Sequence, residues 1–287
     1  MHPKIETLDK ILNFAAGNDA IRLVGMEGSR VNVNVPRDDL QDYDVTFVVT
    51  DAALDSFTED DAWLDVFGER VIMQKPEAMA LFSPEHDWLF SFLMIFTDGV
   101  KIDLSIVPLA SLSKYLASDK LLKILLDKDG LVSPTPSPTD RDYWISAPTP
   151  AFFDDCCNEF WLVSTYIMKG ILRKEILFAA WHMERIARPQ LFTMLSWKIG
   201  SRHGYNFSIG KHNKYIKKYL LPDEWKMLAK TYRMDNLKSC RAAMEAALAL
   251  FRQTSKYVAE KFGFKYPNYD EKVTDFIKSF TFPRKKE

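Results

Sequence analysis

Hydrophobic residues follow two different periods in the two halves of this 287-residue chain. In the first half, short apolar runs at 21–26, 45–49, 69–75, 90–97 and 100–107 are bounded by turn-forming residues, which is typical of strands. The Asp98-Gly99 pair between the last two runs predicts a tight hairpin. Residues 5–16 repeat apolar side chains at helical spacing and end at Gly17, so a helix is expected before the first strand.

The second half has helical periodicity, which predicts helices at 150–172, 175–203, 211–232 and 236–262. Thr149 and Pro150 suit an N-cap and the first helical position. Pro189 should kink or split the second helix, and Gly204 and Gly263 should end helices. The segment SPTPSPTD at 133–140 is too rich in proline for a helix or strand and is the best candidate for a linker.

These patterns predict an α+β protein with two domains. A mixed β-sheet domain flanked by helices is expected at 1–145, and a bundle of helices at 146–287. The formal net charge of −1 argues against a nucleic-acid-binding protein, and no apolar run approaches the roughly 20 residues of a membrane span. Three cysteines, two of them adjacent, do not form a disulfide framework, and they fit a location in the cytoplasm.

Two aspartates stand at the start of the second apolar run. Asp42 and Asp44 fall on one face of this strand, because successive side chains point to opposite faces. Adjacent carboxylates beside a buried strand repel each other unless a cation neutralises them, and Mg²⁺ prefers such oxygen ligands. The turn at Gly28-Ser29, which follows the first apolar run, offers backbone N–H donors that suit a phosphate.

A third carboxylate lies on the last predicted strand of the first half. Asp103 shares its face with Lys101 and Ser105, whereas the apolar residues of this strand occupy the opposite face. From the pattern alone Asp103 is either an exposed side chain or a neighbour of the first two aspartates.

Six sequence segments, which follow one another along the chain, resemble those of a known family: GSRVNVNVPRDDLQDYDVTFVV, ERVIMQKPE, DGVKIDLSIVP, LLDKD, FDDCCNEFWLVSTYIMKG and PNYDE. Together they resemble the streptomycin-adenylylating aminoglycoside 6-adenylyltransferases. These enzymes belong to the nucleotidyltransferase superfamily, which has the fold of DNA polymerase β. The resemblance covers nearly the whole chain.

The resemblance implies that AMP is transferred from ATP to the 6-hydroxyl of streptomycin, with Mg²⁺ as cofactor and pyrophosphate as product. Asp42 and Asp44 would be catalytic metal ligands, and Asp103 would complete the metal shell or accept the hydroxyl proton. The β- and γ-phosphates would be held by Gly28, Ser29 and Arg30.

The predicted helix at 150–172 has two distinct stripes. An apolar stripe runs through Phe153, Cys157, Phe160, Ser164, Ile167 and Ile171, and a more polar one through Asp155, Glu159, Leu162, Tyr166 and Lys169. By pattern alone the polar stripe is a solvated face with its charges placed as the helix dipole prefers.

The resemblance implies a second reading of the polar stripe. In this reading Lys169 meets the triphosphate, whereas Asp155, Glu159 and Tyr166 contact the cationic antibiotic. Glu159 is the second candidate for the general base.

Two other functions remain open at this point. The chain could adenylylate another aminoglycoside or a lincosamide, or it could be an inactive nucleotide-binding regulatory module. The expected partners are ATP and streptomycin, without nucleic acid or membrane, and the protein is expected to be a monomer.

Overall fold

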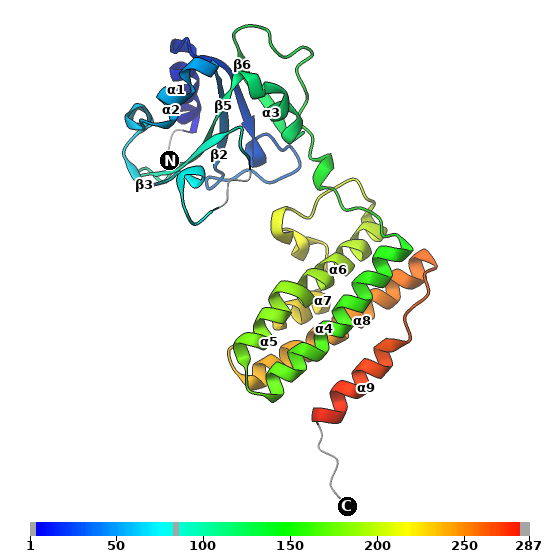
Figure 1. Ribbon diagram of the computed structural model, residues 1–287. Coiled ribbons are helices and arrows are strands. Elements are labelled where there is room, and N and C mark those ends of the chain that lie inside the picture. The colour runs from blue at the N-terminus through cyan, green and yellow to red at the C-terminus, as the bar shows by residue number, and fades with distance from the viewer. Residues whose placement is uncertain (1–3, 83–85, 282–287) are drawn as a thin grey trace, which may run out of the picture. The chain divides into compact units, whose positions relative to one another are not determined.

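The chain divides into two compact units, Met1–Asp142 and Tyr143–Glu287. The computed structural model describes residues 4–82 and 86–281 and is shown in Figure 1. The first unit contains a β-sheet with helices, and the described part of the second is built from helices. The predicted α+β class is therefore confirmed. No helix in the described ranges is both long and apolar enough to cross a membrane.

The first unit is built on a six-stranded sheet with the order β3-β4-β5-β2-β1-β6. Only β2 and β5 pair in parallel, and the other neighbours pair antiparallel, so the sheet is mixed as predicted. Its strands are β1 (Ile21–Glu27), β2 (Tyr43–Val49), β3 (Arg70–Gln74), β4 (Phe90–Phe96), β5 (Lys101–Pro108) and β6 (Leu122–Asp127).

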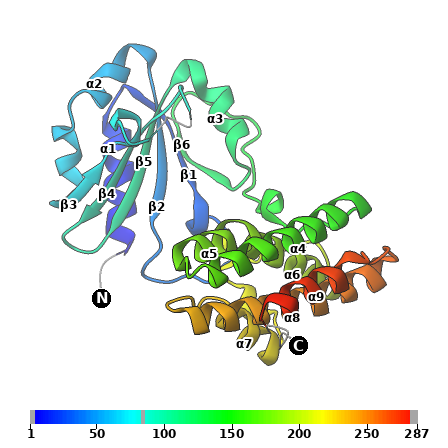
Figure 2. The ribbon, with the colours of Figure 1, turned by 60° about the horizontal axis from the view of Figure 1, so that its bottom comes forward.

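Helices cover both faces of this sheet (Figure 2). On one face, Ile11 and Ala15 of α1 (Lys4–Gly17) pack in one cluster with Phe47. The short helix α2 (Leu54–Thr58) and the 3₁₀ segment Ala62–Phe67 complete that layer. On the other face, Tyr115 of α3 (Leu112–Ser118) packs against Leu23.

The sequence pattern assigned no element to α3 or β6. Residues 121–126 form a nearly continuous apolar run, and periodicity alone does not tell such a short run from part of a buried helix. The run is a strand because it pairs with β1, with Leu126 opposite Val24 and Leu122 opposite Glu27.

The second unit buries its core between long helices. They are α4 (Pro150–Leu172), α5 (Ile176–His182), α6 (Arg188–His203), α7 (Pro222–Lys230), α8 (Leu237–Phe262) and α9 (Tyr269–Thr281). At the centre of this core, the Phe160 ring of α4 stacks on the Phe251 ring of α8 with 3.7 Å between centroids. Aromatic pairs of this kind stabilise a core beyond the area that they bury.

Most predicted helix ends are confirmed. The Thr149 side chain accepts a hydrogen bond from the Phe152 backbone N–H, which caps α4. Gly204 and Gly263 follow α6 and α8 with φ of 90° and 69°, values that glycine adopts without steric cost. A π-helical segment, Met183–Ala187, separates α5 from α6 just before Pro189, as the proline predicted.

The predicted helix at 211–232 is wrong. Only α7 forms there, and two 3₁₀ turns precede it at Lys211–Asn213 and Ile216–Lys218. His212 and Asn213 have positive φ angles of 56° and 61°, which an α-helix cannot contain. Pro222 supplies no backbone N–H and therefore starts the helix instead of continuing one.

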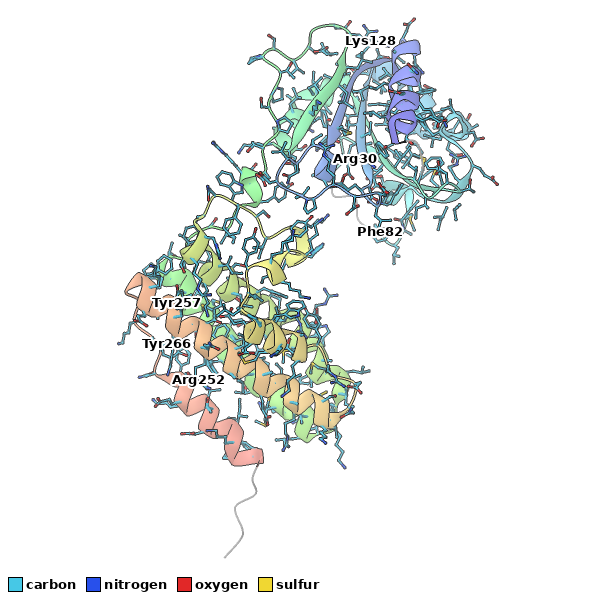
Figure 3. All side chains as sticks on the ribbon, turned by 180° about the vertical axis from the view of Figure 1, so that it is seen from behind. Arg30, Phe82, Lys128, Arg252, Tyr257 and Tyr266 are labelled. Atoms are coloured by element: carbon cyan, nitrogen blue, oxygen red, sulfur yellow. The ribbon has the colours of Figure 1, made fainter. Side chains whose placement is uncertain are left out.

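Two sets of buried charges hold the second unit together. The Lys198 ammonium donates to Oε1 of Glu224, and both side chains are almost completely enclosed, with 4% and 3% exposed. Arg252 donates through Nε and Nη2 to the Asp270 carboxylate, to which the Tyr266 hydroxyl also donates at 2.8 Å (Figure 3). Each buried carboxylate is thus matched by its own cation.

All three cysteines are free and buried in the second unit. Burial raises the pKa of the Cys156 thiol to about 12 and raises that of Cys157 and Cys240 as well. Cys157 lies on the apolar stripe of α4, whose members are all buried as predicted: Phe153, Cys157, Phe160, Ser164, Ile167 and Ile171.

Candidate active site

A tight turn at the end of β1 brings the backbone against a carboxylate of β2. Gly28 has a φ of 73°, and a Cβ built there would lie 2.1 Å from Oδ2 of Asp44. Any other residue would therefore displace the Asp44 side chain as well as strain the backbone. The 3₁₀ turn Gly28–Arg30 continues from this glycine, so the predicted phosphate-binding turn and the predicted metal ligand are in direct contact.

Arg30 fixes the segment that carries Asp42. Its guanidinium donates to the backbone carbonyl of Asp42 at 2.9 Å and to that of Gln41 at 2.6 Å. It also lies over the Tyr43 ring, 3.5 Å from the centroid. The Gln41 side chain in turn donates to the Ser29 carbonyl at 3.2 Å, which ties the two ends of the loop together. These contacts give Arg30 a positioning role, and its contact with phosphate stays a prediction.

The parallel pairing of β2 and β5 brings the three predicted aspartates together. Asp44 is the register partner of Asp103, which places these two side by side on adjacent strands. Asp42 immediately precedes β2 and lies near Asp103 as well. The Lys101 ammonium joins the two acids, since it lies 2.7 Å from Oδ2 of Asp42 and 2.7 Å from Oδ2 of Asp103. Asp103 is thus a neighbour of the first two aspartates and not an isolated surface residue.

Lys101 also belongs to this site, although sequence reasoning gave it no role. Partial burial lowers the pKa of its ammonium, but the hydrogen bonds and charges of Asp103 and Asp42 outweigh that effect and hold the pKa above its usual value. The signal was present in the sequence, since Lys101 and Asp103 are two residues apart on one strand and therefore share a face.

The oxygen donors at this site fit a hard divalent cation such as Mg²⁺. Oδ1 of Asp103 is buried and has no hydrogen-bond partner among the described residues, as expected of an oxygen that awaits a ligand. Over residues 4–82 and 86–281, however, no three His, Cys, Asp or Glu side chains are gathered closely enough to hold a metal as they stand. The aspartates therefore have the right oxygen donors for the metal, but the Lys101 ammonium lies between the carboxylates of Asp42 and Asp103.

A half-buried acid lies at the end of β1, next to this turn. The Tyr115 hydroxyl donates to Oε1 of Glu27, the last residue of β1 and the register partner of Asp44. Burial raises the pKa of the Glu27 carboxyl to about 7. A Cβ at Gly25 would overlap the Tyr115 hydroxyl, so this glycine makes room for the pair. An acid at the end of a buried strand was visible in the sequence, but its distant tyrosine was not.

A pocket opens beside Asp42 within the first unit. It lies between α1, the segment 39–43 and the turn that joins β4 to β5. Its charged lining is mixed, since it contains Lys10, Arg30 and Lys101 together with four acids, which are Glu6, Asp39, Asp42 and Asp98.

The other predicted site residues belong to α4 in the second unit. Asp155 and Lys169 are exposed, and Glu159 and Tyr166 are half-buried. The Lys169 ammonium lies 5.5 Å from the centroid of the Tyr166 ring, so these two are neighbours on the polar stripe. The stripe exists as predicted, and the ligands of its residues stay predictions.

Comparisons with known proteins agree with the sequence resemblance. The profile of the family described as streptomycin adenylyltransferase matches residues 1–280. The aminoglycoside 6-adenylyltransferase of Campylobacter jejuni is 50% identical over 96% of this chain and 95% of its own. The enzyme of the same name from Bacillus subtilis is 47% identical over 96% of this chain and 97% of its own. That from Staphylococcus aureus is 42% identical over 97% of this chain and 99% of its own.

Proposed function

Because this chain belongs to the streptomycin adenylyltransferase family, we propose that it transfers AMP from ATP to the 6-hydroxyl of streptomycin and releases pyrophosphate. Membership makes it an adenylyltransferase, and the antibiotic, the nucleotide and the metal are the proposed part. The main support for the proposal is that Asp44 and Asp103 lie side by side on paired strands, next to the Gly28 turn and to Asp42.

The reaction requires one bond to form and one to break at the α-phosphate. The 6-hydroxyl oxygen attacks this phosphorus, and the bond to the oxygen that bridges to the β-phosphate breaks, so that pyrophosphate leaves. The hydroxyl proton goes to a carboxylate, for which we propose Asp103, with Glu159 as the second candidate. The carboxylates of Asp42, Asp44 and Asp103 would hold Mg²⁺, which when bound neutralises charge on the phosphates.

The chain's own residues would position the triphosphate. Gly28 and Ser29 begin a 3₁₀ turn, and the first backbone N–H groups of such a turn, which have no partner within it, would bind phosphate oxygens. Arg30 would act mainly through the backbone of Asp42, which it holds by a hydrogen bond. For α4 we propose the roles that the family resemblance implies: Asp155, Glu159 and Tyr166 bind the antibiotic, and Lys169 binds a phosphate.

The test is pyrophosphate release with Mg²⁺ against a panel of aminoglycosides and lincosamides, with ATP and GTP in parallel. We expect turnover with streptomycin and ATP. Turnover with a different antibiotic and none with streptomycin would make the chain a sister enzyme. If pyrophosphate were released with none of the acceptors, the hypothesis of an inactive regulatory module would replace this proposal.

A further inference from the structure

The Lys101 ammonium is a cation shared by two carboxylates. It is equidistant from Asp42 and Asp103, at 2.7 Å from one oxygen of each. It reaches this place from the first residue of β5, on the face that also carries Asp103. The Lys101 side chain is 34% exposed, so the ammonium is neither sealed in the core nor free in solvent.

The charges at this place do not balance. The Lys101 ammonium contacts two carboxylates, those of Asp42 and Asp103, and Oδ1 of Asp103 has no hydrogen-bond partner in the described part of the chain. Asp44 adds a further acid on the adjacent strand, as the register partner of Asp103. One lysine thus lowers the repulsion between the acids without removing it. The remaining negative charge can still attract a divalent cation.

The lysine and a metal cannot share these oxygens at low energy. Mg²⁺ or Mn²⁺ binds carboxylate oxygens at about 2.0–2.2 Å, so a metal on the oxygens that Lys101 now contacts would lie within about 5 Å of its ammonium. Two cations this close repel each other. The metal therefore competes with the ammonium, and the pocket that Lys101 and Asp42 both line contains two further acids, Glu6 and Asp98.

We propose that Lys101 is an internal counter-ion that fills the metal site of the free protein and that a divalent cation must displace. This inference rests on the proposed function of the three aspartates as metal ligands. Its consequence is that metal alone binds weakly. A metal that arrives with nucleotide binds better, because the phosphates offer the displaced ammonium a new partner.

Binding of Mn²⁺ alone, followed by electron paramagnetic resonance of the free ion, tests the inference without catalysis. Lys101→Met should bind Mn²⁺ at least ~10-fold more tightly than the wild-type protein, because the competing charge is gone. Lys101→Arg keeps the charge and should bind as weakly as the wild type. Lys123→Met, which changes an exposed lysine of β6 in the same sheet, is the matched control and should have no effect.

A second readout is thermal unfolding of the same proteins. In the presence of EDTA, Lys101→Met should unfold at a lower temperature than the wild type, because the carboxylates then repel each other without a counter-ion. Added Mn²⁺ should raise its unfolding temperature by more than it raises that of the wild type. Lys101→Gln serves in the same two measurements if the methionine variant does not fold.

Two outcomes overturn different statements. If Lys101→Met binds Mn²⁺ as weakly as the wild type or more weakly, while Asp42→Asn and Asp44→Asn bind it more weakly still, the metal site stands and the counter-ion inference is wrong. If the aspartate variants bind Mn²⁺ like the wild type, the proposed metal site itself is wrong.

Discussion

Each unit of the molecule holds a lysine ammonium against carboxylates, and the two arrangements differ in balance and in exposure. In the second unit Lys198 faces one acid, Glu224, and both are almost completely buried. The other oxygen of Glu224 accepts the backbone N–H of Leu221 at 2.9 Å. In the first unit Lys101 faces two acids, Asp42 and Asp103, is one-third exposed, and leaves Oδ1 of Asp103 without a hydrogen-bond partner among described residues.

The difference separates a structural ion pair from a site that can exchange its cation. A buried pair with every polar atom satisfied gains nothing from a further ligand, and removing one member leaves an isolated charge. A half-exposed group with excess negative charge accepts an added cation readily. Variants of each arrangement should therefore change different properties, and the four predictions below are ordered by the size of the expected effect.

The largest effect is expected at the unbalanced site. Asp42→Asn or Asp44→Asn should lower kcat by ~10³-fold or more, which is at least about 4 kcal/mol of transition-state stabilisation. Pyrophosphate release measures turnover, and circular dichroism should show that both variants fold, since repulsion between acids is relieved. Asp87→Asn, an exposed acid of the same unit, is the control. Near wild-type turnover at ordinary Mg²⁺ concentrations would remove these aspartates from the mechanism.

The next largest effect is expected at the balanced pair, and on stability instead of catalysis. Glu224→Gln keeps an acceptor for Leu221 but leaves the Lys198 ammonium buried without a carboxylate, which should cost about 3 kcal/mol of unfolding free energy. Chemical denaturation measures it, with the exposed neighbour Asp223→Asn as control. The double variant Lys198→Met, Glu224→Gln should recover much of the loss. A loss in the double variant as large as in the single one would contradict the ion-pair explanation.

The acids of α4 provide a third case, because they are not enclosed as Glu224 is, and no ion pair joins Asp155 or Glu159 to a lysine within residues 4–82 and 86–281. Asp155→Asn and Glu159→Gln should each weaken streptomycin binding at least ~10-fold, about 1.4 kcal/mol, with ATP binding nearly unchanged. Calorimetric titration with both ligands is the measurement, and the exposed Asp154→Asn on the same helix is the control. Unchanged streptomycin affinity in both variants would point to another region, first of all the acidic run at 59–61.

The smallest effect is expected for a lysine that packs over a ring. Lys169→Ala should raise the KM for ATP about fivefold, or ~1 kcal/mol, and should change the KM for streptomycin much less. Lys256 is a matched control in the same unit, since its ammonium lies 5.4 Å from the Tyr266 ring. Equal changes in both KM values, or none, would make Lys169 an ordinary residue of a solvated face.

The sequence predicted those parts of the structure that depend on local pattern. The alternation in β5 placed Asp103 on the polar face, and Thr149 with Pro150 located the start of α4. The sequence pattern did not predict elements whose structure depends on contacts with distant segments or on unusual backbone angles. The strand β6 needs β1 as a partner, and the turns before α7 depend on the positive φ angles at His212 and Asn213.

Sequence reasoning selected the acids of this candidate site and missed the contacts of the residues around them. Asp42, Asp44 and Asp103 were visible because carboxylates beside buried strands are unusual and matched a family motif. The hydrogen bonds of Arg30 to the carbonyls of Gln41 and Asp42 were not, because a guanidinium next to a phosphate-binding turn predicts a phosphate contact. The pairing of Glu27 with Tyr115 joins residues 88 positions apart, which no local pattern indicates.

The buried thiols make the protein well suited to site-specific labelling. Maleimides and other alkylating probes react with thiolates, and the raised pKa values and burial of Cys156, Cys157 and Cys240 leave little thiolate exposed at neutral pH. A single cysteine introduced at an exposed position, such as that of Lys123, would therefore react far faster than the three native ones. Fluorophores and spin labels can thus be attached without first removing the native cysteines, and the core that contains them stays unaltered.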